Sequence, residues 1–194
     1  MLAAIVMTLV IVAYRVVLGM VGTSEMGWLH NFCPLAAVAL CGAAFLPRRI
    51  AFTLPLVALF VSDLLLNSYY GVGLLSLTMV PQYFALGMIA ALGWLLRVNP
   101  RLPYLLLGSA GGSIFFYLIT NTGAWVADPL YSQASIGWLQ AMTTGLPQYQ
   151  PPTWVFFRNS LVSDLLFTAI FFGCMAFRHE TRVVAAKPQG TAAW

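Results

Sequence analysis

Six long apolar runs, separated by short breaks, dominate this sequence and leave it few ways to fold. The runs cover residues 2–21, 32–46, 51–67, 74–96, 103–120 and 153–177. A membrane-spanning helix needs about 20 predominantly apolar residues, and several of these runs approach that length. Because lipid offers no hydrogen-bond partners to the backbone, each run is expected to be helical. The sequence therefore predicts an all-α, polytopic membrane protein with six transmembrane helices.

Composition agrees with this class and argues against others. Charged residues make up 7% of the chain, whereas soluble domains carry roughly 25%. The net charge of +4 comes from basic residues in short loops and the tail, which does not fit a nucleic-acid-binding face. Cys33, Cys41 and Cys174 lack metal-ligand spacing, and no phosphate-binding loop, HExxH motif or nucleophile elbow occurs. We therefore expect no cofactor, no metal site and no enzyme activity.

The basic residues predict how the helices are oriented. Seven of the nine follow the second, fourth and sixth runs, namely Arg48, Arg49, Arg97, Arg101, Arg178, Arg182 and Lys187. With alternating spans all seven fall on one side, which the positive-inside rule identifies as cytoplasmic. Both termini then lie inside. The expected organisation is a six-helix domain over residues 1–178, followed by a cytoplasmic tail over 179–194.

Two local patterns refine this picture. Pro81 lies inside the fourth run and predicts a kink there. In the long outer segment before the sixth run, Ile136, Leu139, Met142 and Leu146 recur at near-helical spacing beside polar residues. That spacing predicts a short amphipathic helix at the membrane interface. This helix would be either a cap that seals the bundle or a lid over a pocket.

The sequence VSDLL occurs twice, at residues 61–65 and 162–166, and each copy places an aspartate inside an apolar run. A carboxylate that faced lipid there would cost about 3 kcal/mol or more, so Asp63 and Asp164 are expected to face the protein interior. Arg15 and Arg158 lie at similar predicted depth. Two interpretations stay open, namely ion pairs that lock the helices together and a polar, solute-binding cavity. The two copies lie in spans of opposite direction, as inverted transporter repeats would.

Several stretches resemble one protein family. They are NFCPLAAVAL at 31–40, FLPRR at 45–49, SDL at 62–64, TNTGAW at 120–125, FFRNS at 156–160 and DLLF at 164–167. Over residues 28–175 the chain resembles an uncharacterised family of bacterial six-helix membrane proteins, DUF6580. That family in turn looks similar to the S components of energy-coupling-factor transporters, which bind vitamins or metal ions from outside and depend on a coupling protein and two ATPases. The resemblance implies a multi-pass protein of the bacterial cytoplasmic (inner) membrane.

Two functional hypotheses follow. The first is an S-component-like subunit for uptake of a small polar solute. Its outward-facing pocket would be lined by Arg15, Asp63, Asn121, Arg158 and Asp164. The second is a non-catalytic accessory subunit of a larger respiratory or photosynthetic membrane complex. Its face for a partner helix would consist of Ala36, Ala39, Gly42 and Ala43, because small residues let helices approach closely. Both hypotheses expect the lipid bilayer and other membrane subunits as partners, and the first adds a small-molecule ligand.

Overall fold

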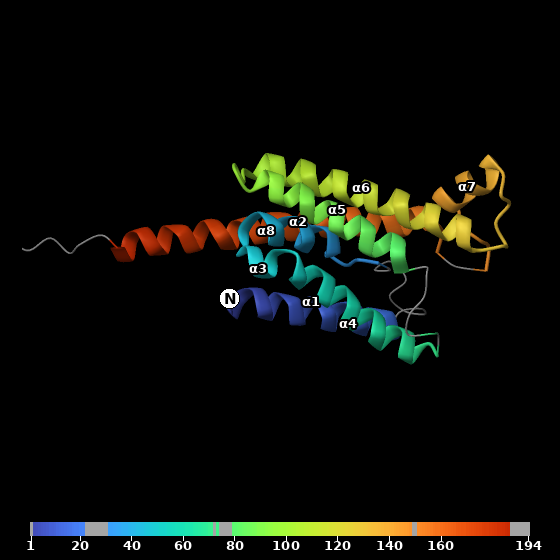
Figure 1. Cartoon of the computed structure of the whole chain (residues 1–194), viewed down its shortest axis with the longest axis horizontal. Helices are drawn as coiled ribbons and strands as arrows, with labels where there is room; N and C mark the ends of the chain where they lie inside the picture. Colours follow the sequence, from blue (N-terminus) through green and yellow to red (C-terminus); the bar gives the residue numbers. More distant parts are fainter. Residues whose placement is uncertain (1, 22–30, 72, 74–78, 149–150, 187–194) are drawn as a thin grey trace, which may run out of the picture.

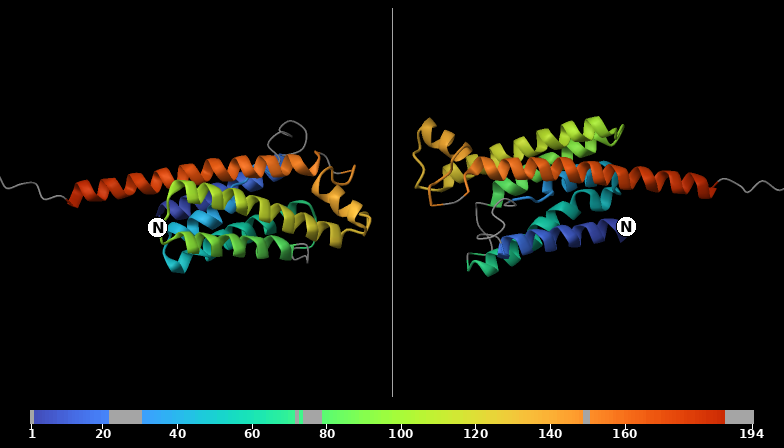
Figure 2. Two further views of the ribbon diagram at one scale, coloured as in Figure 1. Left: turned by 90° about the horizontal axis from the view of Figure 1, so that it is seen from above. Right: turned by 180° about the vertical axis from the view of Figure 1, so that it is seen from behind.

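The chain folds into a bundle whose helices run in both directions along its long axis (Figures 1 and 2). The computed structural model describes residues 2–21, 31–71, 73, 79–148 and 151–186, without the side chains of 2–8, 11, 21 and 177–186. The helices are α1 (Leu2–Val21), α2 (Leu35–Phe45), α3 (Arg48–Ala51), α4 (Thr53–Tyr69), α5 (Val80–Leu96), α6 (Leu102–Ala127), α7 (Ser135–Met142) and α8 (Thr153–Ala186). No strand occurs in the described ranges, so the predicted all-α class is confirmed. The side chains of Arg178, Arg182 and Lys187, used above to predict orientation, lie outside the description.

The helices have the length and composition of a membrane protein. Three helical stretches among the described residues are long and apolar enough to cross a bilayer, namely Arg48–Tyr69, Leu102–Ala127 and Thr153–Ala176. Two further apolar helices are shorter, α2 with 11 residues and α5 with 17. At 1.5 Å per residue, α2 extends about 16 Å, which is roughly half of the hydrocarbon core. The helix α2 is therefore too short to cross a membrane alone.

The helix boundaries depart most from the predicted runs at three places. The helix α5 begins at Val80, so Pro81 lies in its first turn and starts the helix, and the predicted kink is wrong. A first-turn residue has no intrahelical N–H bond to lose, which is why proline is tolerated there. At their C-terminal ends α6 continues to Ala127 and α8 to Ala186, beyond the predicted ends at 120 and 177. No proline occurs within α8, and the next one in the sequence is Pro188.

The short helix α2 lies at the centre of the bundle. Every residue from Leu35 to Ala44 is buried, and the helix packs against α4, α5, α6 and α8. Its apolar residues are distributed around the whole circumference, which is the pattern of a helix buried on all sides. The closest approach is to α5, where a Cβ added at Gly93 would overlap the backbone of Leu40. A glycine is therefore required at this crossing.

The small residues predicted to face a partner helix pack inside this chain. Ala36, Ala39 and Ala43 belong to the buried core, and Gly42 is buried with them. They do form a helix-packing face, but its neighbours are helices of the same bundle, with α5 the most extensively packed. In this structure these four residues present no surface to another protein.

The long helices alternate in direction, so their ends gather at two opposite ends of the molecule (Figure 1). One end carries Arg48, Arg49, Arg97 and Arg101 and is called the arginine end below. The other end carries α7 and is called the α7 end. The C-terminal ends of α1, α4 and α6 and the N-terminal ends of α2, α5 and α8 point toward the α7 end.

The predicted short helix of the last long connection is confirmed as α7. It is tied to α6 by the hydroxyl of Tyr117, which donates to the carbonyl of Met142 over 2.5 Å. The indole of Trp125 donates to the carbonyl of Ser132 over 2.8 Å. Tyr131, Ala141 and Leu146 form a small apolar cluster with Trp125. This segment is thus packed onto the end of α6, as a cap would be.

Candidate functional site

A cavity of about 230 Å³ lies between α1, α2, α5, α6 and α8 in the half of the bundle nearer α7. Its polar lining includes Arg15, Gln82, Ser113, Asn121, Ser160 and Asp164. Its aromatic lining comprises Phe116, Tyr117, Phe156 and Phe157. The sequence therefore predicted three of the lining residues, Arg15, Asn121 and Asp164. Gln82, Ser113 and Ser160 were not predicted.

Asp164 of α8 caps the buried N-terminus of α2. Its Oδ1 accepts a hydrogen bond from the amide of Ala37 over 2.9 Å, and the amide of Ala36 lies near the same carboxylate. The residue at the N-cap position of α2 is Pro34, whose side chain makes no capping hydrogen bond. The first N–H groups of a helix need acceptors, and the positive end of the helix dipole favours an anion. A carboxylate from another helix supplies both.

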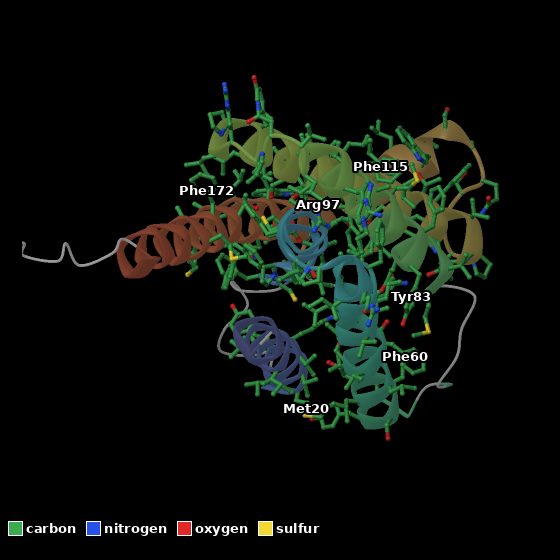
Figure 3. All side chains as sticks on the ribbon, turned by 60° about the vertical axis from the view of Figure 1, so that its left-hand side comes forward. Met20, Phe60, Tyr83, Arg97, Phe115 and Phe172 are labelled. Atoms are coloured by element: carbon green, nitrogen blue, oxygen red, sulfur yellow. The ribbon has the colours of Figure 1, made fainter. Side chains whose placement is uncertain are left out.

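The opposite end of α2 meets a cation. Nη1 of Arg97 lies 3.4 Å from the carbonyl oxygen of Ala43, in the last turn of the helix. The guanidinium groups of Arg97 and Arg48 both lie over the Trp94 ring, 5.1 and 5.0 Å from its centroid. Figure 3 shows Arg97 beside α2. A negative side chain at the N-terminus and a positive one at the C-terminus both favour the dipole of this buried helix.

A line of small polar side chains joins α6 to α8 behind Asp164. The hydroxyl of Ser113 lies 2.7 Å from Oδ2 of Asp164 and 3.0 Å from the carbonyl of Ser109. One turn away, the hydroxyl of Thr168 donates to Ser109 Oγ over 3.0 Å. All four residues are buried. The signal in the sequence was their spacing of four residues on each helix, Ser109 with Ser113 and Asp164 with Thr168.

Arg15 and Asp63 form an ion pair between α1 and α4. Nη2 of Arg15 lies 2.7 Å from Oδ1 of Asp63, and the two side chains are 19% and 7% exposed. Nη1 of the same guanidinium donates to the hydroxyl of Ser62 and lies 3.4 Å from the carbonyl of Leu59. The hydroxyl of Tyr83, which faces α4 in Figure 3, donates to Oδ2 of Asp63 over 3.3 Å. Asp63 therefore holds Arg15 at the cavity without lining the cavity itself.

This pair leads to a prediction about stability. Replacing Asp63 with leucine leaves Arg15 as a partly buried cation without its carboxylate, so the free energy of unfolding should fall by about 3 kcal/mol. Adding Arg15→Met to Asp63→Leu removes the uncompensated charge and should restore most of that loss. Thermal unfolding of the detergent-purified variants measures both effects. If the single and double variants were equally destabilised, the loss of stability in Asp63→Leu would not come from the unpaired charge of Arg15.

Arg158 does not join the predicted pocket. Its Nε and Nη2 donate to Oδ1 of the neighbouring Asn159 over 3.2 and 3.1 Å. Its guanidinium lies over the Trp154 ring, 5.5 Å from the centroid, and the residue is exposed. Arg158 lies on the outer surface of α8 because Asp164, six residues later, points inward toward α2. Asn121 does line the cavity, and its Nδ2 donates to the carbonyl of Tyr117 over 2.8 Å.

The two VSDLL copies make different contacts. In the first copy Arg15 contacts both Ser62 and Asp63. In the second copy Asp164 binds amides and Ser113, while Ser163 Oγ is a buried side-chain atom for which the described residues provide no hydrogen-bond partner. The copies thus place one aspartate against a cation and the other against a helix terminus.

Comparison with known proteins identifies a family for this chain but no individual protein that resembles it. No curated protein and no solved structure matches this chain. A family model does match, and it covers residues 1–187, which is almost the full length. The stretches around Asn31, Asp63, Asn121 and Asp164 all lie within the matched range. The chain belongs to the family of unknown function DUF6580.

Proposed function

We propose that this chain is a multi-pass protein of the bacterial cytoplasmic membrane that binds a small polar solute for uptake, in the manner of an S component. The observation that carries the proposal is a polar cavity inside an apolar bundle, with Arg15, Asn121 and Asp164 in its wall. Its volume of about 230 Å³ is below the roughly 300–1,000 Å³ of pockets for drug-sized ligands, which favours a smaller solute. A separate coupling protein and ATPases would drive uptake.

The position of the α2 N-terminus supports this proposal. Residues 31–34 precede α2 without helical structure, and Asn31 and Cys33 line the cavity. Non-helical backbone at membrane depth is tolerated where it is buried in protein or lines a cavity. Transporters place their sites near the bilayer midplane at the ends of such interrupted helices. Together with the non-helical residues 31–34, the short helix α2 would then form one of six membrane crossings.

The alternating helix directions support the six-span, N-in and C-in topology. The arginine end would face the cytoplasm by the positive-inside rule, and the α7 end with the nearer cavity would face outward. Solute binding is favoured over the accessory-subunit alternative because the residues assigned to its partner face are packed within this bundle.

A plugged cavity tests the proposed function. Thr120 lines the cavity, and its hydroxyl bonds back to the carbonyl of Phe116 over 2.8 Å, so Thr120→Phe should fill the space without leaving another side chain unpaired. Leu118→Phe is the matched control because Leu118 lies on the same helix and is 41% exposed. The wild type and the control, gently extracted from native membranes, should release a stoichiometric small molecule on denaturation, as detected by mass spectrometry.

Thr120→Phe should release at least tenfold less of that molecule, since a tenfold loss requires only about 1.4 kcal/mol of binding free energy. Equal thermal unfolding midpoints for the two phenylalanine variants would exclude misfolding as the cause. The proposed function would be wrong if the wild type released no solute, or if Thr120→Phe retained as much solute as Leu118→Phe.

A further inference from the structure

A second cavity adjoins the first at the α7 end. It has a volume of about 380 Å³ and is lined by Gln82, Thr120, Ala124, Ala127, Asp128 and Pro129. Gln82 and Thr120 line both cavities, so the two spaces meet at these side chains. A solute arriving at the C-terminal end of α6 would therefore pass Gln82 and Thr120 to reach Asp164.

The charges along this path are predominantly negative. In the second cavity Asp128 is the charged side chain among the described lining residues. In the first cavity the charged lining residues are Arg15 and Asp164. Arg15 is neutralised by Asp63 at 2.7 Å, whereas the described contacts of Asp164 are with neutral donors, namely backbone amides and Ser113. Among the described charged residues that line the two cavities, Asp128 and Asp164 therefore have no basic side chain in contact with them.

The surroundings of Asp164 favour a positive ligand in two further ways. The N-terminus of α2 contributes roughly half a positive charge, which offsets only part of the negative charge of a carboxylate. The rings of Phe116, Tyr117, Phe156 and Phe157 line the same space. Aromatic rings attract cations through their faces, and they attract anions less well.

We propose that the solute is a small organic cation, a protonated amine or a quaternary ammonium compound, whose charge binds beside Asp164. It reaches this site through the second cavity, where Asp128 attracts it. The inference rests on the proposed function and narrows its substrate class. Apolar parts of the molecule lie against the phenylalanine rings, and the cavity volume restricts it to a size below that of drug-like ligands.

Three ligands of one carbon skeleton test the charge preference. Cyclohexylmethylammonium, cyclohexanecarboxamide and cyclohexanecarboxylate are nearly equal in size and differ in charge. Titration calorimetry with the purified full-length protein should show the ammonium compound binding on the order of tenfold more tightly than the other two. Asp164→Asn should abolish this preference. Asparagine still accepts the amide hydrogen bond at the α2 N-terminus, so the unfolding midpoint without ligand should stay near that of the wild type.

Asp128→Asn tests the path. It should slow ammonium association and reduce its dependence on ionic strength, because a surface carboxylate acts mainly on the rate of encounter. Preferred binding of the carboxylate or the amide, or an ammonium preference that survives in Asp164→Asn, would overturn the assignment. A neutral or anionic solute released from native membranes would also overturn it while supporting the proposed function. Release of no solute at all would remove both proposals.

Discussion

Replacing Asp164 with alanine is expected to lower the free energy of unfolding by about 3 kcal/mol, because it leaves the buried N-terminus of α2 without an acceptor. The amide of Ala37 loses its hydrogen-bond acceptor, and the amide of Ala36 loses the nearby carboxylate. Ser113 retains an alternative partner in the carbonyl of Ser109, so the loss falls mainly on α2. Thermal unfolding in detergent, followed by circular dichroism, measures the effect.

Asp164→Asn separates capping from charge. Asparagine is as good an N-cap as aspartate, so this variant should keep its stability within about 1 kcal/mol of the wild type, losing only the charge–dipole term. Equal destabilisation by alanine and asparagine would contradict the capping role and assign the effect to charge. A stable alanine variant would show that α2 does not depend on Asp164.

Replacing Gly93 with alanine is expected to lower the free energy of unfolding by about 2–3 kcal/mol or more, as overpacking does in tightly packed cores. A Cβ at this position meets the backbone carbonyl of Leu40, which cannot rotate away as a side chain would. The helices α2 and α5 would have to move apart at the centre of the bundle. Because α2 forms a wall of the cavity, the variant should also retain less solute.

Gly87→Ala is the matched control for this prediction. Gly87 lies on the same helix, and a Cβ added there meets nothing within 4 Å. Removing a flexible glycine from a helix should leave stability unchanged or raise it by about 0.5–1 kcal/mol. If Gly93→Ala were as stable as Gly87→Ala, the close approach of α2 and α5 described here would be wrong.

Helix class and the approximate extent of helices followed from the apolar runs. The run at 2–21 coincides with α1, and the spacing from Ile136 to Leu146 located α7. The burial of α2 was not predicted, although its unbroken Ala- and Leu-rich sequence with no polar face is the pattern of a helix surrounded by others. The same small residues suit packing against a helix of this chain or of another chain, and the sequence does not distinguish these two kinds of interface.

The site was harder to predict because its pairing is set by three-dimensional packing. Hydropathy placed four charges within the apolar runs, but it did not indicate which of them meet. Arg15 pairs with Asp63 across α1 and α4, whereas Arg158 lies outside and Asp164 caps a helix. A cap supplied by a residue 127 positions away along the chain has no local sequence signature. In the sequence, the only sign of the buried Ser109 and Ser113 of α6 was their spacing of four residues.

The dependence of the cavity on α2 connects stability with function. Asp164 is at once the cap of α2 and a wall residue of the cavity, so a ligand that contacts its carboxylate also contacts the group that holds the central helix. Solute binding should therefore stabilise the whole bundle, in proportion to the logarithm of the free ligand concentration.

The most direct measurement is an experimental structure of the protein extracted gently from its native membrane, at a resolution that shows bound small molecules. We expect non-protein density between Arg15, Asn121 and Asp164, with the carboxylate of Asp164 still at the first amides of α2. A cavity closed by side chains, or one holding only solvent in protein that has never been separated from its cellular solutes, would contradict this expectation.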